Sequence, residues 1–73
     1  MAMDTVVWEG WTVRDFIAEL EPLADMVASG HGIDRPWKDK KELASWCAEN
    51  QPYYKKRIPE VVEYFAARYG YRN

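Results

Sequence analysis

The sequence contains little of the chemistry on which small secreted or metal-binding domains depend. Its 73 residues include one cysteine, Cys47, and one histidine, His31. A single cysteine excludes an internal disulfide, and small secreted domains usually need several. A zinc site needs three or four convergent His, Cys, Asp or Glu side chains. We therefore expect neither a metal nor a cofactor.

A long hydrophobic run is also missing. No segment approaches the roughly 18 apolar residues of a transmembrane helix. Residues 1–11 contain Asp4 and Glu9 in place of the apolar centre of a signal peptide. We expect a cytoplasmic protein that makes no membrane contact.

Catalytic patterns are absent from the sequence as well. The Gly-His-Gly segment 30–32 is not followed by the Gly-Lys-Ser/Thr of a phosphate-binding loop. Cys47 shares an apolar stripe with Leu43 and Trp46, where a thiol usually behaves as a small buried hydrophobe. We predict that the protein is not an enzyme and has no catalytic residues.

Aromatic and apolar residues are abundant. Hydrophobic residues make up 48% of the chain, which contains four Trp, five Tyr and two Phe. A core of this size rarely supplies more than roughly 3–5 kcal/mol of net stability, so most large apolar side chains must take part in it. The length leaves room for one domain, residues 1–73.

The longest apolar face predicts a first helix over residues 13–29. Thr12 is placed to cap it, Asp15 favours its N-terminal dipole, and Gly30 offers a left-handed stop. Pro22 kinks or divides the helix, because proline lacks an N–H and clashes with the preceding turn. Glu19, Glu21 and Asp25 are expected on its outer side. Its apolar stripe consists of Phe16, Ile17, Leu20, Leu23, Ala24 and Val27.

Two further helices are expected over residues 40–49 and 59–69. Asp39 and Glu42 have the spacing of a capping box at the start of the second helix. Pro59 suits the first position of the third helix, and Gly70 is a natural stop. The sequence therefore predicts an all-α fold: a compact three-helix domain, with a short fourth helical turn at 52–57 as an alternative.

Residues 1–10 are predicted to form an extended N-terminal arm. Residues 5–8 are β-branched or aromatic, but the chain offers no second convincing strand to pair with them. The arm is expected to pack on the helices through Val7 or Trp8. Pairing with a second copy of the chain is the alternative, which gives a monomer or a weak homodimer.

Charge divides the chain into two halves. Residues 1–34 hold one Arg and seven acids, whereas residues 35–73 hold nine Lys or Arg and five acids. Basic residues lie among tyrosines at 53–57, a composition that nucleic-acid binders use for phosphates and bases. The overall charge of −2 argues against a general polyanion binder.

More aromatic residues are present than three short helices can bury. Exposed Trp, Tyr and Arg are typical of the energetically important residues of protein–protein interfaces. The alternative is that Trp8 and Trp37 fold back as lids over the core. The predicted partner-binding residues lie off the helical stripes: Trp8, Arg35, Trp37, Lys38, Tyr53, Tyr54, Lys55, Lys56, Arg57 and Tyr71.

These features favour a small non-enzymatic module that binds another protein. Tiny, cysteine-poor, aromatic-rich domains are common among phage- and prophage-encoded regulators of host machinery, an analogy of size and composition. The alternatives are a nucleic-acid-binding transcription regulator that uses residues 53–57 and a self-associating structural module.

Overall fold

The computed structural model describes residues 3–30 and 36–71 as three helices and a small two-stranded sheet. The strands are β1 (Val6–Trp8) and β2 (Trp11–Thr12), and the helices are α1 (Val13–Gly30), α2 (Lys40–Asn50) and α3 (Pro59–Tyr69). The three predicted helices are present. The fold is mostly helical and not purely all-α.

The expected N-terminal arm is a β-hairpin. β1 pairs antiparallel with β2, so the prediction that residues 5–8 have no partner within the chain was wrong. Glu9 and Gly10 form the turn with φ values of 41° and 82°. Positive φ at both central residues matches the twist of a two-residue hairpin. The strands were too short to show an alternating pattern in the sequence.

The hairpin is joined directly to the start of α1. The backbone N–H groups of Val13 and Arg14 donate to the carbonyl groups of Thr5 and Met3, at 3.1 and 2.9 Å. Thr12 Oγ1 accepts from the N–H of Asp15 at 3.2 Å, and the Asp15 carboxylate accepts from the N–H of Thr12 at 2.9 Å. These bonds satisfy N–H groups that a helix start leaves without intrahelical acceptors.

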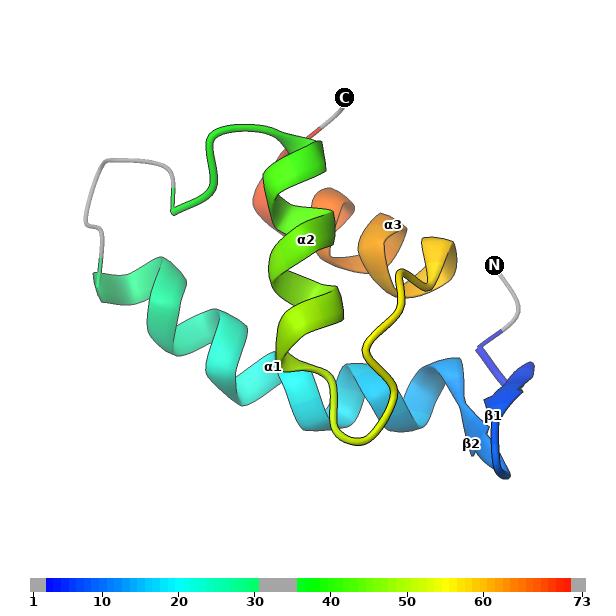
Figure 1. The fold of residues 1–73 in the computed structure, drawn as a ribbon. Coiled ribbons are helices and arrows are strands. Elements are labelled where there is room, and N and C mark those ends of the chain that lie inside the picture. The colour runs from blue at the N-terminus through cyan, green and yellow to red at the C-terminus, as the bar shows by residue number, and fades with distance from the viewer. Residues whose placement is uncertain (1–2, 31–35, 72–73) are drawn as a thin grey trace.

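α1 continues through Pro22 without dividing and bends near its middle (Figure 1). Gly30 is its last helical residue and does not adopt the expected left-handed conformation. Leu23, predicted in the buried stripe, is 44% exposed. Leu23 directly follows Pro22 in the sequence.

The cap predictions for the other helices are confirmed. Asp39 accepts from the N–H of Glu42 at 2.9 Å, Pro59 occupies the first turn of α3, and Gly70 ends that helix with φ 80°. Residues 51–58 are irregular and contain no helical turn, so the alternative of a fourth turn was wrong.

One core joins the three helices. α2 and α3 lie on the same side of α1, and the hairpin lies at the N-terminal end of α1 (Figure 1). Phe16 and Leu20 of α1, Leu43 of α2 and Phe65 of α3 have no exposed surface. Trp37 is buried and packs against Trp46 of α2 and Tyr69 of α3.

Candidate functional site

Four aromatic side chains come together where the hairpin meets the loop between α2 and α3. Trp8 stacks against Tyr53 and Tyr54, with ring centroids 5.9 and 5.8 Å apart. Trp11 meets Tyr53 edge-on at 5.8 Å. We call Trp8, Trp11, Tyr53 and Tyr54 the aromatic surface. Three of these rings are partly buried, whereas Tyr53 is 73% exposed.

The backbone of Tyr53 has an unusual conformation. Its φ of 67° lies in the left-handed region, which costs a residue other than glycine roughly 1–2 kcal/mol. Such conformations persist where the surroundings impose them, and they gather at binding and catalytic sites. The left-handed conformation of Tyr53 therefore marks the loop at residues 51–58 as a candidate functional segment.

Gln51 holds the loop from inside. Its side chain is fully buried, and Nε2 donates to the carbonyl groups of Tyr54 and Lys56, at 2.7 Å each. Its backbone N–H donates to the carbonyl of Cys47 at 3.0 Å, which ties the loop to the end of α2. The exposed ring of Tyr53 is thus presented by a loop with fixed internal hydrogen bonds. Nothing in the sequence distinguished Gln51 from an ordinary residue of a helix end.

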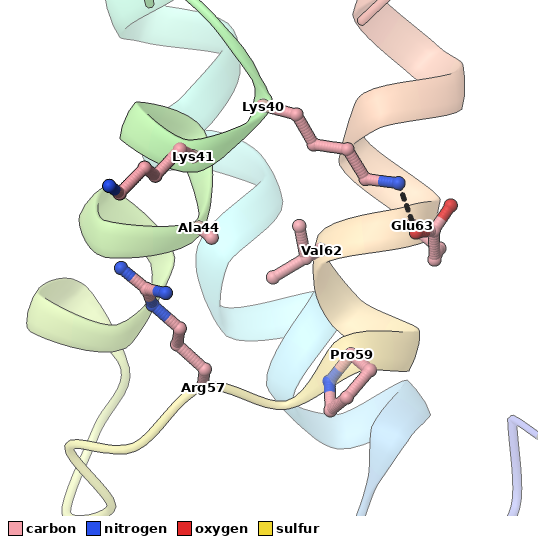
Figure 2. Close-up of a pocket in the computed structure, with 7 residues that line it drawn as sticks. All are labelled: Lys40, Lys41, Ala44, Arg57, Pro59, Val62 and Glu63. Atoms are coloured by element: carbon pink, nitrogen blue, oxygen red, sulfur yellow. Dashed lines mark hydrogen bonds and ion pairs between the residues drawn. The ribbon is translucent and has the colours of Figure 1, made fainter. Parts of the chain in front are cut away.

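The basic residues near the tyrosines do not form one stripe. Lys55 Nζ donates to the carbonyls of Glu49 and Gln51 at 3.1 and 3.0 Å, and so caps the C-terminal end of α2. Arg57 extends along α2 and donates to Ser45 Oγ at 2.9 Å (Figure 2). Lys56 is exposed. Of the three basic residues in the predicted segment, Lys55 and Arg57 are hydrogen bonded to residues of α2.

Trp37 and Tyr71 are core residues, so the expectation that they are exposed was wrong. They are 3% and 4% exposed. The backbone N–H of Trp37 donates to Tyr71 Oη at 2.9 Å, and that hydroxyl donates to the backbone carbonyl of Trp37. Trp37 also packs edge-on against Trp46 at 5.2 Å. The lid interpretation therefore holds for Trp37. Lys38 is exposed, and Arg35 lies outside the described residues.

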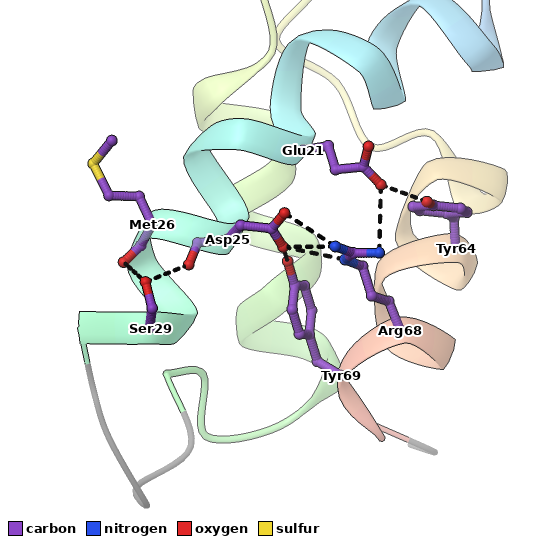
Figure 3. Close-up of polar contacts among 7 residues, drawn as sticks. All are labelled: Glu21, Asp25, Met26, Ser29, Tyr64, Arg68 and Tyr69. Atoms are coloured by element: carbon purple, nitrogen blue, oxygen red, sulfur yellow. Dashed lines mark hydrogen bonds and ion pairs between the residues drawn. The ribbon is translucent and has the colours of Figure 1, made fainter.

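A polar network joins α1 to α3 (Figure 3). Asp25 accepts from both Arg68 Nη2, at 3.0 Å, and Tyr69 Oη, at 2.5 Å. Tyr64 Oη donates to Glu21 at 2.5 Å. Glu21 and Asp25 were expected on the outer face of the helix. They face α3 instead, because that helix supplies their hydrogen-bond donors.

The network alters the acid–base behaviour of its members. The hydrogen bond from Tyr69, and then Arg68, lowers the pKa of Asp25. Burial, helped by the hydrogen bond to Asp25, raises the pKa of Tyr69 to about 12. In both shifts, the hydrogen bond that contributes joins two members of the network. We therefore interpret the network as a structural bridge between the helices.

In residues 3–30 and 36–71, no group of three His, Cys, Asp or Glu side chains could hold a metal ion. His31 lies outside them, and burial raises the pKa of Cys47 to about 12. Over the same ranges, no helix has the length and apolar character needed to cross a membrane.

Comparison of the chain with protein-family models, with curated proteins and with solved structures gave no match.

Proposed function

We propose that this protein is a non-enzymatic protein–protein interaction module that binds its partner through the aromatic surface. The observation that carries the proposal is the exposed Tyr53 ring, which stacks on Trp8 from a left-handed backbone held by Gln51. Val6, on the same strand as Trp8, is also an exposed apolar residue, with 61% of its surface exposed.

Two physical reasons support a binding role. Tyr and Trp are enriched among the residues that dominate binding energy. A ring already fixed by its loop loses little conformational entropy when a partner covers it. An exposed tyrosine without a function would gain stability from an ordinary backbone conformation. Tyr53 instead has a left-handed backbone.

The expected partner is a protein with an apolar pocket for Tyr53 and mixed charge around it. Lys56 on the loop and Glu9 on the hairpin turn are both exposed. A small regulator of host machinery in the cytoplasm, as phages and prophages encode, is the setting that we propose, on the analogy of size and composition.

The test is capture of partners from bacterial lysate by the tagged protein, repeated after nuclease treatment and at high salt. Tyr53→Ala is compared with Met26→Ala, which alters a side chain 69% exposed on α1. We expect a protein partner that survives nuclease, is retained by Met26→Ala, and binds Tyr53→Ala at least about tenfold more weakly, as for a residue important to binding. Circular dichroism checks that both variants fold.

Three outcomes would contradict the proposal. Equal capture by Tyr53→Ala and the wild type would remove the aromatic surface from the contact. Loss of all partners with nuclease would favour the nucleic-acid alternative, for which binding falls steeply with salt. A mass that rises with concentration in light scattering, and falls back in Tyr53→Ala, would favour self-association.

A further inference from the structure

A groove lies between α2 and α3, separate from the aromatic surface. Its volume is about 340 Å³. Figure 2 shows the lining residues on both helices and on the loop that joins them, with the Lys41 amine pointing away from Val62 and Glu63. The lining residues are Lys40, Lys41, Ala44, Arg57, Pro59, Val62 and Glu63.

The floor of the groove is aliphatic. Ala44 comes from α2, and Pro59 and Val62 come from α3. Ala44 and Val62 also belong to the core, with 8% and 6% of their surfaces exposed. The floor is therefore formed in part by side chains that are packed in the core.

The rim of the groove is cationic and only partly neutralised. Lys40 is paired with Glu63 across the groove, as the dashed line in Figure 2 shows. Arg57 is hydrogen bonded to the neutral Ser45. Neither Arg57 nor Lys41 has an ion pair with an acid in residues 3–30 and 36–71. Three basic residues and one acidic residue thus line the groove, and only Lys40 meets the carboxylate of Glu63.

We propose that this groove binds an acidic peptide segment of a partner protein, with an aliphatic side chain on the floor and carboxylates on the rim. Arg57 can donate two parallel hydrogen bonds to one carboxylate, and Lys41 attracts another as a point charge. A volume near the lower limit for ligand pockets suits a single aliphatic anchor.

The lining chemistry favours a peptide over a nucleic acid. Proteins that bind single strands stack the bases on aromatic side chains, and none of the seven lining residues is aromatic. The inference stands apart from the proposed role of the aromatic surface, since the groove contains none of its four residues.

The experiment titrates the isotope-labelled full chain with acetyl-Glu-Glu-Leu-Glu-Glu-amide and follows backbone amide signals by NMR. We expect saturable shifts at Lys41, Ala44 and Val62. Replacing the leucine by alanine, or the glutamates by lysines, should abolish them. In the double variant Lys41→Glu, Arg57→Glu, affinity should fall at least about tenfold, as expected for the loss of two charged contacts. Arg14→Glu is the matched control, because it reverses an exposed charge on α1 that lies outside the groove.

Four results would overturn the proposal. The first is the absence of shifts at millimolar peptide, and the second is shifts confined to the hairpin and the loop around Tyr53. The third is wild-type affinity in the double variant. The fourth is a stronger response of the same groove signals to oligothymidylate than to the peptide. The spectra also report folding, and failure here leaves capture through Tyr53 unaffected.

Discussion

At the scale of single residues, Tyr53 and Gln51 show how a buried side chain can hold a neighbouring backbone in an unfavourable conformation. The left-handed backbone of Tyr53 is unfavourable by itself. Gln51 offsets the cost by hydrogen bonding two carbonyls of the loop. The backbone strain at Tyr53 can be measured by substitution, because glycine adopts the same backbone conformation without strain.

The strain predicts an order of stability between two variants of Tyr53. Both Tyr53→Gly and Tyr53→Ala lose the stacking on Trp8. Glycine relieves roughly 1–2 kcal/mol of left-handed strain and adds about 0.5–1 kcal/mol of backbone entropy cost. We therefore expect Tyr53→Gly to be the more stable variant, by about 0.5–1 kcal/mol, in urea unfolding.

Ala67→Gly is the control for this comparison. Ala67 lies exposed on α3, where φ is right-handed. Glycine there should lower the free energy of unfolding by about 1 kcal/mol. An alanine variant of Tyr53 as stable as the glycine variant would show that its backbone is not strained.

Cys47 gives a second prediction for a single residue. Its side chain is fully buried, and burial raises the pKa of the thiol to about 12. Because the thiolate is the reactive form, the native protein should react very slowly with a thiol reagent near neutral pH. The rate should rise in urea in proportion to the unfolded fraction measured by circular dichroism. Rapid reaction of the native protein would contradict burial at this position.

At the scale of helices, the acidic side of α1 is a contact surface for α3. Two carboxylates of α1 accept hydrogen bonds from three residues of α3. A helix face that looks solvent-exposed in the sequence is therefore a packed one. The arrangement links the stability of the α1–α3 contact to pH.

The alkaline limb of stability should depend on Tyr69. Its pKa is raised from 10.0 to about 12 in the folded protein. A raised pKa stabilises the fold fully below the unfolded value, and this contribution is lost as pH rises through the folded value. Between about pH 10 and 12, the wild type should lose more stability than Tyr69→Phe. Cys47 and Tyr64, whose pKa values are also raised, are present in both proteins, so the difference between the two proteins reports Tyr69.

The acid limb should depend on Asp25. Its pKa lies below the usual 3.8 in the folded protein. The resulting stability is present above 3.8 and is lost as pH falls through the lower folded value. Asp25→Asn should therefore show a weaker loss of stability on acidification than the wild type. Parallel urea midpoints for the two proteins at every pH would contradict the pKa shift.

At the scale of the whole molecule, one small core carries all three helices. Phe65 of α3 is fully buried. Truncation of a buried phenylalanine to alanine costs about 3–5 kcal/mol, which equals the roughly 3–5 kcal/mol that a core of this size supplies. We expect Phe65→Ala to be largely unfolded at 25 °C by circular dichroism.

Met26→Ala is the control for the core prediction. Met26 is 69% exposed on α1, and a surface substitution of this kind usually changes stability by less than about 0.5 kcal/mol. A natively folded Phe65→Ala variant would mean that the helices do not depend on a shared core.

Part of the candidate site could be predicted from the sequence. Trp8, Tyr53 and Tyr54 lie off the helical stripes, which indicated that they were not ordinary core residues. Their stacking could not be predicted, because it depends on a hairpin and a loop that are far apart in the sequence. Trp37 lies off the stripes too, yet it is buried as a lid. Position off a stripe therefore does not separate a lid from an exposed ring.

The sequence by itself determined the helices and most of their ends. Apolar spacing near 3.6 residues and the caps at Thr12, Asp39, Pro59 and Gly70 act over four residues or fewer. Such signals remain readable without any knowledge of distant contacts.

Only the tertiary structure decided which faces of these elements meet. The pairing of β1 with β2 is a backbone contact between strands too short for a side-chain pattern. Glu21 and Asp25 turn toward α3 because Tyr64, Arg68 and Tyr69 offer donors there. The aromatic surface and the groove between α2 and α3 arise in the same way. Each joins residues whose mutual distance is fixed by packing and not by their spacing along the chain.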